Sequence, residues 1–279
     1  MVIRKDWRYR TKQFIAYTLL IFVLTTTLFP LYIMFATSVK PEGNILPTWD
    51  SLIPKKVTLR NYVDVWKSAN FDRYFLNSVI VTFSVTFLNI ILDSMVAYAL
   101  SRKGFKGSNF VLLIIIATMM IPAQVLMIPL FILIKKIGFY NTYWALILPF
   151  SVQGFGIFLM KQYFDGLPKS LDEAAMIDGA GDFKILFKVL FPISKPAIAV
   201  LGINTFLTTW NSFVYPLIFT NTDNMRTLPI GIAYFNTIHG IDYVHLMAGS
   251  SIATIPVIAV FLAFQKQIIS GLTRGAVKE

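Results

Sequence analysis

The sequence predicts an all-α integral membrane protein that crosses the bilayer about six times. Hydrophobic residues make up 56% of the 279 residues and charged residues only 14%, whereas soluble domains carry about a quarter charged residues. The apolar residues also gather in long runs, and a helix needs about 20 such residues to cross the hydrocarbon core. The chain lacks cysteine, which excludes disulfides and thiolate metal sites.

Apolar segments of this length occur at residues 14–37, 79–100, 110–134, 143–160, 197–219 and 247–264. The first follows a basic stretch, as the core of a signal peptide would, but it is too long for one and no small-residue cleavage site follows it. We therefore expect one transmembrane domain, residues 1–279, with an uncleaved first span. Prolines inside the spans favour either a bundle with a cavity or simple kinks for packing; they are Pro30, Pro122, Pro129, Pro149, Pro216 and Pro256.

The distribution of basic residues predicts that both termini are cytoplasmic. Most of the 25 Lys and Arg residues fall in segments that are internal if the N-terminus is inside, as the positive-inside rule requires. Lys135 and Lys136 run against the rule, and the long first external loop is also basic, although long loops report orientation weakly. The basic residues form no continuous stripe, so we exclude nucleic-acid binding.

The most informative segment is the cytoplasmic loop 167–196, which is too polar to enter the bilayer. Ser170 and Glu173 have the spacing of a capping box that starts a helix, and Gly179 and Gly181 allow a turn after it. A second helix is indicated by an apolar stripe at helical spacing, formed by Phe183, Leu186, Phe187 and Leu190. Such a loop can rest on lipid, but the acidic first helix favours docking against a basic protein surface.

The residues of this loop resemble a known motif. Glu173-Ala174-Ala175, followed by Gly179 and later by Pro192, resembles the EAA motif of ABC importer permeases. The usual Ile-x-Leu-Pro string reads Val-Leu-Phe-Pro here, which is a conservative departure. The resemblance to the carbohydrate-uptake branch covers nearly the whole chain, at Asn61-Tyr62 with Trp66, Asn77-Ser78, Ala97-Tyr98-Ala99 before Arg102, and the tail 271–278.

The chain is most similar to the smaller permease subunit of the maltose-type importers. The resemblance implies the type I ABC importer architecture, in which the EAA loop supplies the coupling helix that docks on an ATPase subunit. It implies ATPase-coupling roles for Glu173, Ala174, Ala175, Asp178, Gly179 and Ala180, and weaker tail contacts for Thr273, Gly275 and Lys278.

The resemblance also implies the partners. They are a second homologous permease, an ABC ATPase dimer that binds ATP and Mg, and an extracytoplasmic solute-binding protein, which the external segment 221–245 would approach. The chain itself has no phosphate-binding G-x-x-x-x-G-K-[ST] loop. We therefore expect a non-catalytic subunit without a cofactor of its own, in a bacterial cytoplasmic (inner) membrane.

A polar stripe in the fifth span is a candidate substrate pathway. Asn204, Thr208, Asn211 and Tyr215 recur at helical spacing, and Trp210 lies close to them. Such side chains can bind a sugar or can equally bond between packed helices. The resemblance implies a di- or oligosaccharide as solute, with a polyol or glycerol phosphate as the other option.

The ionisable residues of the sequence bear on a metal site and on the alternative functions. Asp93, the one acid inside a predicted span, is more consistent with a structural partner than with a pathway role. His239 and His245 make a poor metal site, so no metal is expected. An ion-coupled secondary transporter is the alternative function, although such proteins usually need more intramembrane ionisable residues, and a channel or scaffold without an energy source is the third.

Overall fold

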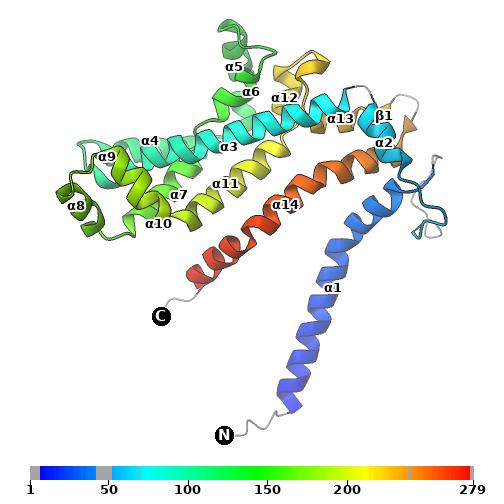
Figure 1. Ribbon diagram of the computed structural model, residues 1–279, viewed down its shortest axis with the longest axis horizontal. Coiled ribbons are helices and arrows are strands. Elements are labelled where there is room, and N and C mark those ends of the chain that lie inside the picture. Colours follow the sequence, from blue (N-terminus) through cyan, green and yellow to red (C-terminus); the bar gives the residue numbers. More distant parts are fainter. Residues whose placement is uncertain (1–6, 42–51, 69, 238–239, 277–279) are drawn as a thin grey trace. The chain divides into compact units, whose positions relative to one another are not determined.

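The computed structural model describes residues 7–41, 52–68, 70–237 and 240–276 (Figure 1). The chain forms two compact units. The first comprises Met1–Ala69 and Ile232–Thr254, and the second comprises Asn70–Gly231 and Ile255–Glu279. Each unit is described by itself.

The first unit contains the long helix α1 (Trp7–Ser38), the short helix α2 (Arg60–Lys67) and the start of α14 (Tyr243–Ala276). Strands β1 (Asn236–Thr237) and β2 (Gly240–Ile241) form an antiparallel pair before α14. The side-chain amide of Asn61 donates to the carbonyls of Ser38 and Lys40, each at 2.7 Å, and so ties α2 to the end of α1. Asn61, the first residue of the Asn61-Tyr62 pair, thus has a structural role.

The second unit is built on three helices, and α3 (Phe71–Arg102) packs mainly against α7 (Gly154–Asp165) and α11 (Lys195–Trp210) (Figure 1). Polar residues of α3 are buried, among them Asn77, Asn89 and Asp93, whereas Phe83 and Phe87 are exposed. A helix that turns its polar side chains inward and its large apolar ones outward matches a lipid environment.

Three predicted spans are interrupted. Segment 110–134 is two helices, α4 (Ser108–Met119) and α5 (Ala123–Lys136), bent by 99° at a break that contains Pro122. Segment 143–160 begins with α6 (Tyr143–Ile147) and the 3₁₀ helix η2 (Leu148–Phe150) and continues as α7. Segment 197–219 is α11 followed by α12 (Val214–Phe219). Proline removes an intrahelical hydrogen bond, which explains why such spans break rather than continue straight.

By length and composition the described residues include four helices that can cross a membrane, or up to six spans if each of two bent pairs counts as one. The four are Tyr9–Ser38, Phe71–Arg102, Tyr143–Asp165 and Tyr243–Gln267. The third of these takes α6, η2 and α7 together as one span. The bent pairs are Ser108–Met119 with Ala123–Lys136, and Asp182–Ile193 with Lys195–Trp210, the latter bent by 87°. Beyond α7 lie α8 (Ser170–Ile177), α9 (Asp182–Lys184), the π-helix η3 (Ile185–Leu190) and α10 (Phe191–Ile193). After α12 come the 3₁₀ helix η4 (Asp223–Met225) and α13 (Leu228–Ala233).

Candidate functional site

The loop 167–196 folds into a helical hairpin at the C-terminal end of α3. Helix α8 ends at a left-handed glycine, Gly179, with φ +73°. The N–H of Gly179 donates to the carbonyl of Met176 at 3.0 Å, and the N–H of Ala180 donates to that of Ala175 at 2.9 Å. These two bonds form a Schellman motif, which ends a helix and reverses the chain.

The start of α8 differs from the predicted capping box. Lys169, not Ser170, is at the N-cap, and no side chain caps the helix. The Lys169 carbonyl accepts the N–H groups of Asp172 and Glu173, at 3.0 and 3.1 Å. A capping serine needs an extended backbone, and Ser170 is already in the helix. The capping-box prediction is therefore wrong.

The second half of the hairpin is not the regular α-helix that the stripe predicted. Residues 185–190 form a π-helix, whose hydrogen bonds span five residues instead of four. The change in period buries Ile185 together with Leu186 and Leu190 and leaves Phe183 67% exposed. Phe183 therefore does not belong to the buried stripe.

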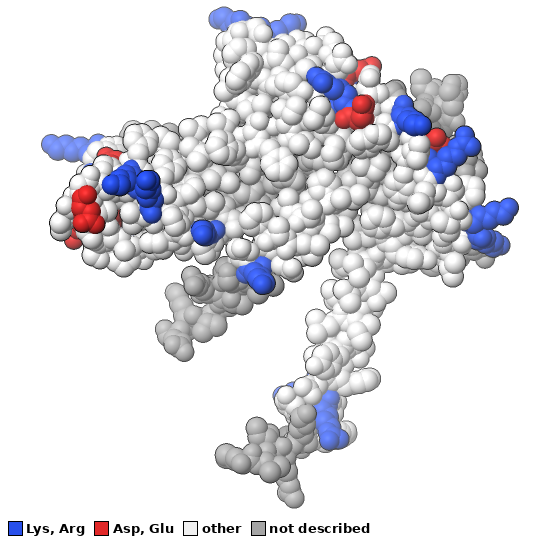
Figure 2. Space-filling model, viewed as in Figure 1, with Lys and Arg blue, Asp and Glu red and all other residues white. Residues whose placement is uncertain are grey.

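The predicted coupling residues divide into two groups. Glu173, Ala174, Asp178 and Gly179 are exposed. Ala175 and Ala180 are half-buried and pack against a core that contains Phe164 and Leu190. Two exposed apolar side chains were not predicted, Met176 and the 86% exposed Ile177. Figure 2 shows acidic and basic side chains together at the end of the molecule that carries α8 and α9.

Asp172 is buried, whereas its neighbour Glu173 is exposed. The carboxylate Oδ2 of Asp172 lies 3.2 Å from Nε of Arg102, the last residue of α3, and both side chains are less than a tenth exposed. Nearby, Lys103 forms an exposed ion pair with Asp182 of α9. This bond to Asp182 raises the pKa of Lys103 above its ordinary value.

The tail residues predicted to contact the ATPase are only partly described. Thr273 and Gly275 lie within the helical backbone of α14, and Lys278 lies outside the described residues. In the segment 221–245, His245 Nδ1 is 2.5 Å from Oδ2 of Asp242, and His239 lies outside the described residues.

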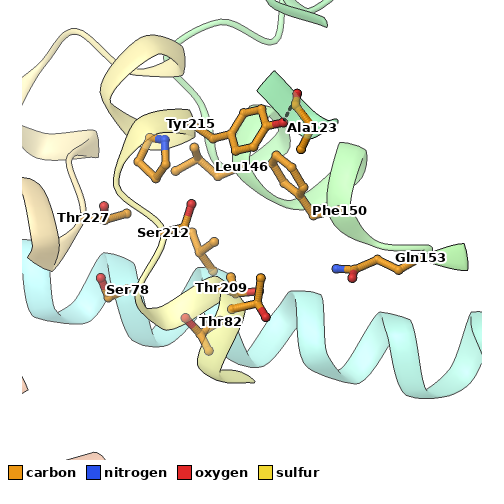
Figure 3. A pocket seen from close by; sticks show the side chains of 13 residues that line it. Ser78, Thr82, Ala123, Leu146, Phe150, Gln153, Thr209, Ser212, Tyr215 and Thr227 are labelled. Carbon is orange, nitrogen blue, oxygen red and sulfur yellow. Dashed lines mark hydrogen bonds between the residues drawn. The ribbon is translucent and has the colours of Figure 1, made fainter. Parts of the chain in front are cut away.

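A cavity of about 300 Å³ lies in the second unit, and its walls come mainly from α3, α11, α12 and the segment 146–153 before α7. Figure 3 shows hydroxyl groups and aromatic rings on its walls. Its lining residues are Ser78, Val81, Thr82, Ala123, Leu146, Phe150, Gln153, Thr208, Thr209, Ser212, Tyr215, Pro216 and Thr227. None of these is charged, and the cavity therefore suits a neutral, hydroxylated solute.

Two of the five predicted pathway residues line this cavity, Thr208 and Tyr215. Asn204 and Asn211 are exposed, and the Asn211 amide donates to the carbonyl of Leu207 in its own helix at 2.9 Å. Trp210 is buried and stacks on Phe206, with the ring centroids 5.7 Å apart. The structure therefore brings together only part of the predicted stripe.

Other walls of the cavity were missed by the sequence analysis. The ring of Phe150 lies 4.8 Å from that of Tyr215, whose hydroxyl donates to the carbonyl of Ala123 at 2.9 Å (Figure 3). Ser78 and Thr82 come from α3. Their spacing of four residues places them on one face, and this was the signal available in the sequence.

Asp93 has a structural partner. Its Oδ1 accepts a hydrogen bond from the backbone N–H of Gln153 at 3.0 Å, at the residue before α7. A carboxylate there also interacts favourably with the positive end of that helix. Among the described residues no three His, Cys, Asp or Glu side chains gather as metal ligands.

The broken membrane helices, the uncharged cavity and the helical hairpin at one end define a membrane transport protein. Comparison with known proteins gives the family. Residues 90–274 match the model of the binding-protein-dependent transport system inner membrane component. Because this match covers more than half of the chain, the protein belongs to that family.

Two related permease proteins align with this chain over nearly its full length. The chain is 38% identical over 260 residues to the arabinooligosaccharides transport system permease protein AraQ of Halalkalibacterium halodurans, covering 92% of this chain and 93% of that one. It is 39% identical over 256 residues to the trehalose/maltose transport system permease protein MalG of Thermococcus litoralis, covering 90% and 91%.

A solved structure confirms the predicted fold class. A chain in the crystal structure of a bacterial ABC transporter that imports the acidic polysaccharide alginate matches with a TM-score of 0.83 and 25% identity, covering 95% of this chain and 98% of that one. The protein is thus an inner-membrane, multi-pass permease subunit of an ABC importer and not an enzyme. This excludes the ion-coupled secondary transporter that the sequence left open.

Proposed function

We propose that the chain forms half of the pathway by which a neutral di- or oligosaccharide enters the cell, together with a second homologous permease. An extracytoplasmic binding protein delivers the sugar, and an ABC ATPase dimer, which binds ATP and Mg, supplies the energy. The chain acts as a single permease domain with both termini in the cytoplasm, as the distribution of its basic residues favours.

The uncharged wall of the cavity is the observation that supports a neutral sugar. Ser78, Thr209 and Ser212 carry hydroxyl groups, and Phe150 and Tyr215 carry aromatic faces. Sugars are bound by these two kinds of groups. A phosphorylated or acidic solute would need a cation to offset its buried charge, and none of the residues that line the cavity is charged.

Two buried hydroxyl groups of the cavity strengthen this proposal. The Oγ1 atoms of Thr82 and Thr227 have no hydrogen-bond partner within the described part of the chain. Buried polar groups nearly always find a partner, and the hydroxyls of a sugar supply both donors and acceptors. The names of several relatives, which refer to oligosaccharides of arabinose and galactose, point the same way.

We assign the ATPase contact to the exposed face of α8 and the turn that follows. Glu173 and Asp178 supply carboxylates, and Ala174 and Gly179 let a partner approach the backbone. Ile177 adds an apolar side chain that an interface would bury. Ala175 and Ala180 support this face from its own core. Thr273, Gly275 and Lys278 stay candidates for additional contacts.

The pathway residues that do not line the cavity keep a proposed role. Asn204 and Asn211 are exposed on and next to α11, and would face the part of the pathway that the second permease completes. Trp210 supports the wall by packing against Phe206.

Reconstitution tests this function. The chain is co-purified with its second permease and ATPase, placed in liposomes, and supplied with its binding protein and a radiolabelled neutral oligosaccharide. We expect uptake that requires internal ATP and Mg and persists when an ionophore removes the proton gradient. Glu173→Lys should reduce co-purification of the ATPase, because it reverses a charge at the interface. Uptake without the ATPase would refute the proposal.

A further inference from the structure

The inner end of α3 is joined to α8 by a buried ion pair. Nε of Arg102 is 3.2 Å from Oδ2 of Asp172, and the two side chains are 5% and 8% exposed. Nη2 of Arg102 also donates to the carbonyl of Leu167 at 3.0 Å. Arg102 therefore holds both the first turn of α8 and the segment before it. Removing one partner of a buried pair leaves an unpaired charge, which is far more costly than losing an exposed pair.

Other contacts of the same helical turn lie closer to solvent. Ser101 Oγ donates to Oδ1 of Asp165 at 2.6 Å, and Lys103 pairs with Asp182, with side chains 36% and 56% exposed. Exposed pairs of this kind contribute little. Of the two ion pairs between this end of α3 and the hairpin that we expect to dock on the ATPase, that of Arg102 is thus the buried one; it adds a fixed polar contact to the apolar packing of Ala97 and Tyr98 against the hairpin.

Helix α3 itself suits the transmission of a displacement. It runs for 32 residues without proline or glycine, which corresponds to about 48 Å. The neighbouring spans are interrupted, as at the 99° bend between α4 and α5. A continuous helix moves as one rigid element, because kinks arise at proline, glycine or π-bulges.

The outer end of α3 is attached to the chain that leads into α13. The side-chain amide of Asn77 donates to the carbonyls of Asn224 and Arg226, each at 2.8 Å. Ser78 Oγ accepts the N–H of Leu228 at 2.8 Å. Ser78 and Thr82 also line the cavity. One helix therefore connects the hairpin, a wall of the cavity and the segment 224–228.

We propose that Arg102 is a positioning residue for coupling: its ion pair with Asp172 makes α3 follow the docking helix α8, and α3 carries that displacement to Ser78 and Thr82 in the cavity wall. This inference rests on the proposed function. It assigns Asp172 a role distinct from that of Glu173, because Asp172 faces Arg102 and not the partner protein.

The test measures ATP hydrolysed per sugar imported by the reconstituted complex. Arg102→Met and Asp172→Asn should each raise this ratio about tenfold, because the docking face is intact but α3 no longer follows it. The double variant Arg102→Asp with Asp172→Arg should recover much of the coupling. Lys103→Met is the matched control, since it removes the adjacent but exposed pair, and it should change the ratio less than about twofold.

Two results would overturn the inference. One is an unchanged ratio in Asp172→Asn, which alters a single side-chain group and is the variant least liable to misfold. The other is equal effects of Lys103→Met and Arg102→Met. A wild-type complex that shows no ATP-dependent uptake would instead refute the proposed function, and the same assay detects it before any variant is compared.

Discussion

Asp93 of α3 accepts a hydrogen bond from the backbone N–H of Gln153, directly before α7. The contact is possible because Gly156, in the first turn of α7, leaves room for the carboxylate. A Cβ atom at Gly156 would overlap Asp93 Oδ2 and come within 2.8 Å of Cδ1 of Leu201. The three central helices of the second unit, α3, α7 and α11, thus meet at this glycine.

Gly156→Ala should destabilise the protein. Overpacking a core usually costs about 1–3 kcal/mol, and here the added methyl group also displaces a buried carboxylate. We expect a lower melting temperature of the detergent-purified subunit. Gly166→Ala is the matched control, because its nearest atom would be at an ordinary 3.5 Å. Equal melting temperatures for the two variants would contradict the close approach of α3 and α7.

Gly179→Ala should loosen the end of α8. Gly179 has a φ of +73°, and this conformation costs a residue with a Cβ atom about 1 kcal/mol or more. Because that cost makes opening of the helix end easier, we expect roughly fivefold faster amide hydrogen exchange in residues 175–180. Gly181→Ala is the control, since Gly181 has φ −77° and open space around it. Exchange followed by mass spectrometry measures both, and equal rates would count against the Schellman motif.

Thr82→Val should raise KM for the transported sugar. The substitution keeps the shape of the side chain and removes one hydroxyl that we expect the sugar to bond, which predicts about a 2- to 12-fold effect from 0.5–1.5 kcal/mol. Thr86→Val removes another buried hydroxyl of α3, at a residue that does not line the cavity. KM should be unchanged in this control. The same KM in both variants would remove Thr82 from the pathway.

The stability that Lys103 contributes through its ion pair with Asp182 should be lost only at alkaline pH. The pKa of Lys103 is raised in the folded protein above the ordinary 10.5. Its contribution to stability is therefore fully present below pH 10.5 and is lost as the pH rises through the higher folded value. The melting-temperature difference between wild type and Lys103→Met should stay constant up to about pH 10.5. A difference that disappears between neutral pH and about 9 would contradict the raised pKa.

The apolar segments could be located from the sequence because a span requires a long hydrophobic run. Their breaks could not, since a proline such as Pro122 either bends a helix mildly or interrupts it, and the neighbouring helices decide which. The π-helix at 185–190 likewise depends on packing against the core. Its buried face differs from that of the predicted α-helix, and Phe183 is therefore exposed.

The candidate sites show the same division. The helix–turn–helix of the loop follows from local signals, above all Gly179. The inward direction of Asp172 depends on Arg102, which is distant in sequence. Similarly, the predicted stripe supplies Thr208 and Tyr215 to the cavity, and other walls come from α3 and Phe150. Periodicity identifies a face of one helix, but it does not reveal which helices meet there.

Labelling at Ile177 tests the central claim most directly. The chain has no cysteine, so Ile177→Cys places a single thiol on the most exposed large apolar side chain of α8. A membrane-impermeant maleimide should label it in inside-out vesicles stripped of the ATPase, fail to label it when the ATPase is bound, and fail to label it in intact cells. Labelling from the outer face, or labelling that the ATPase does not reduce, would contradict the account.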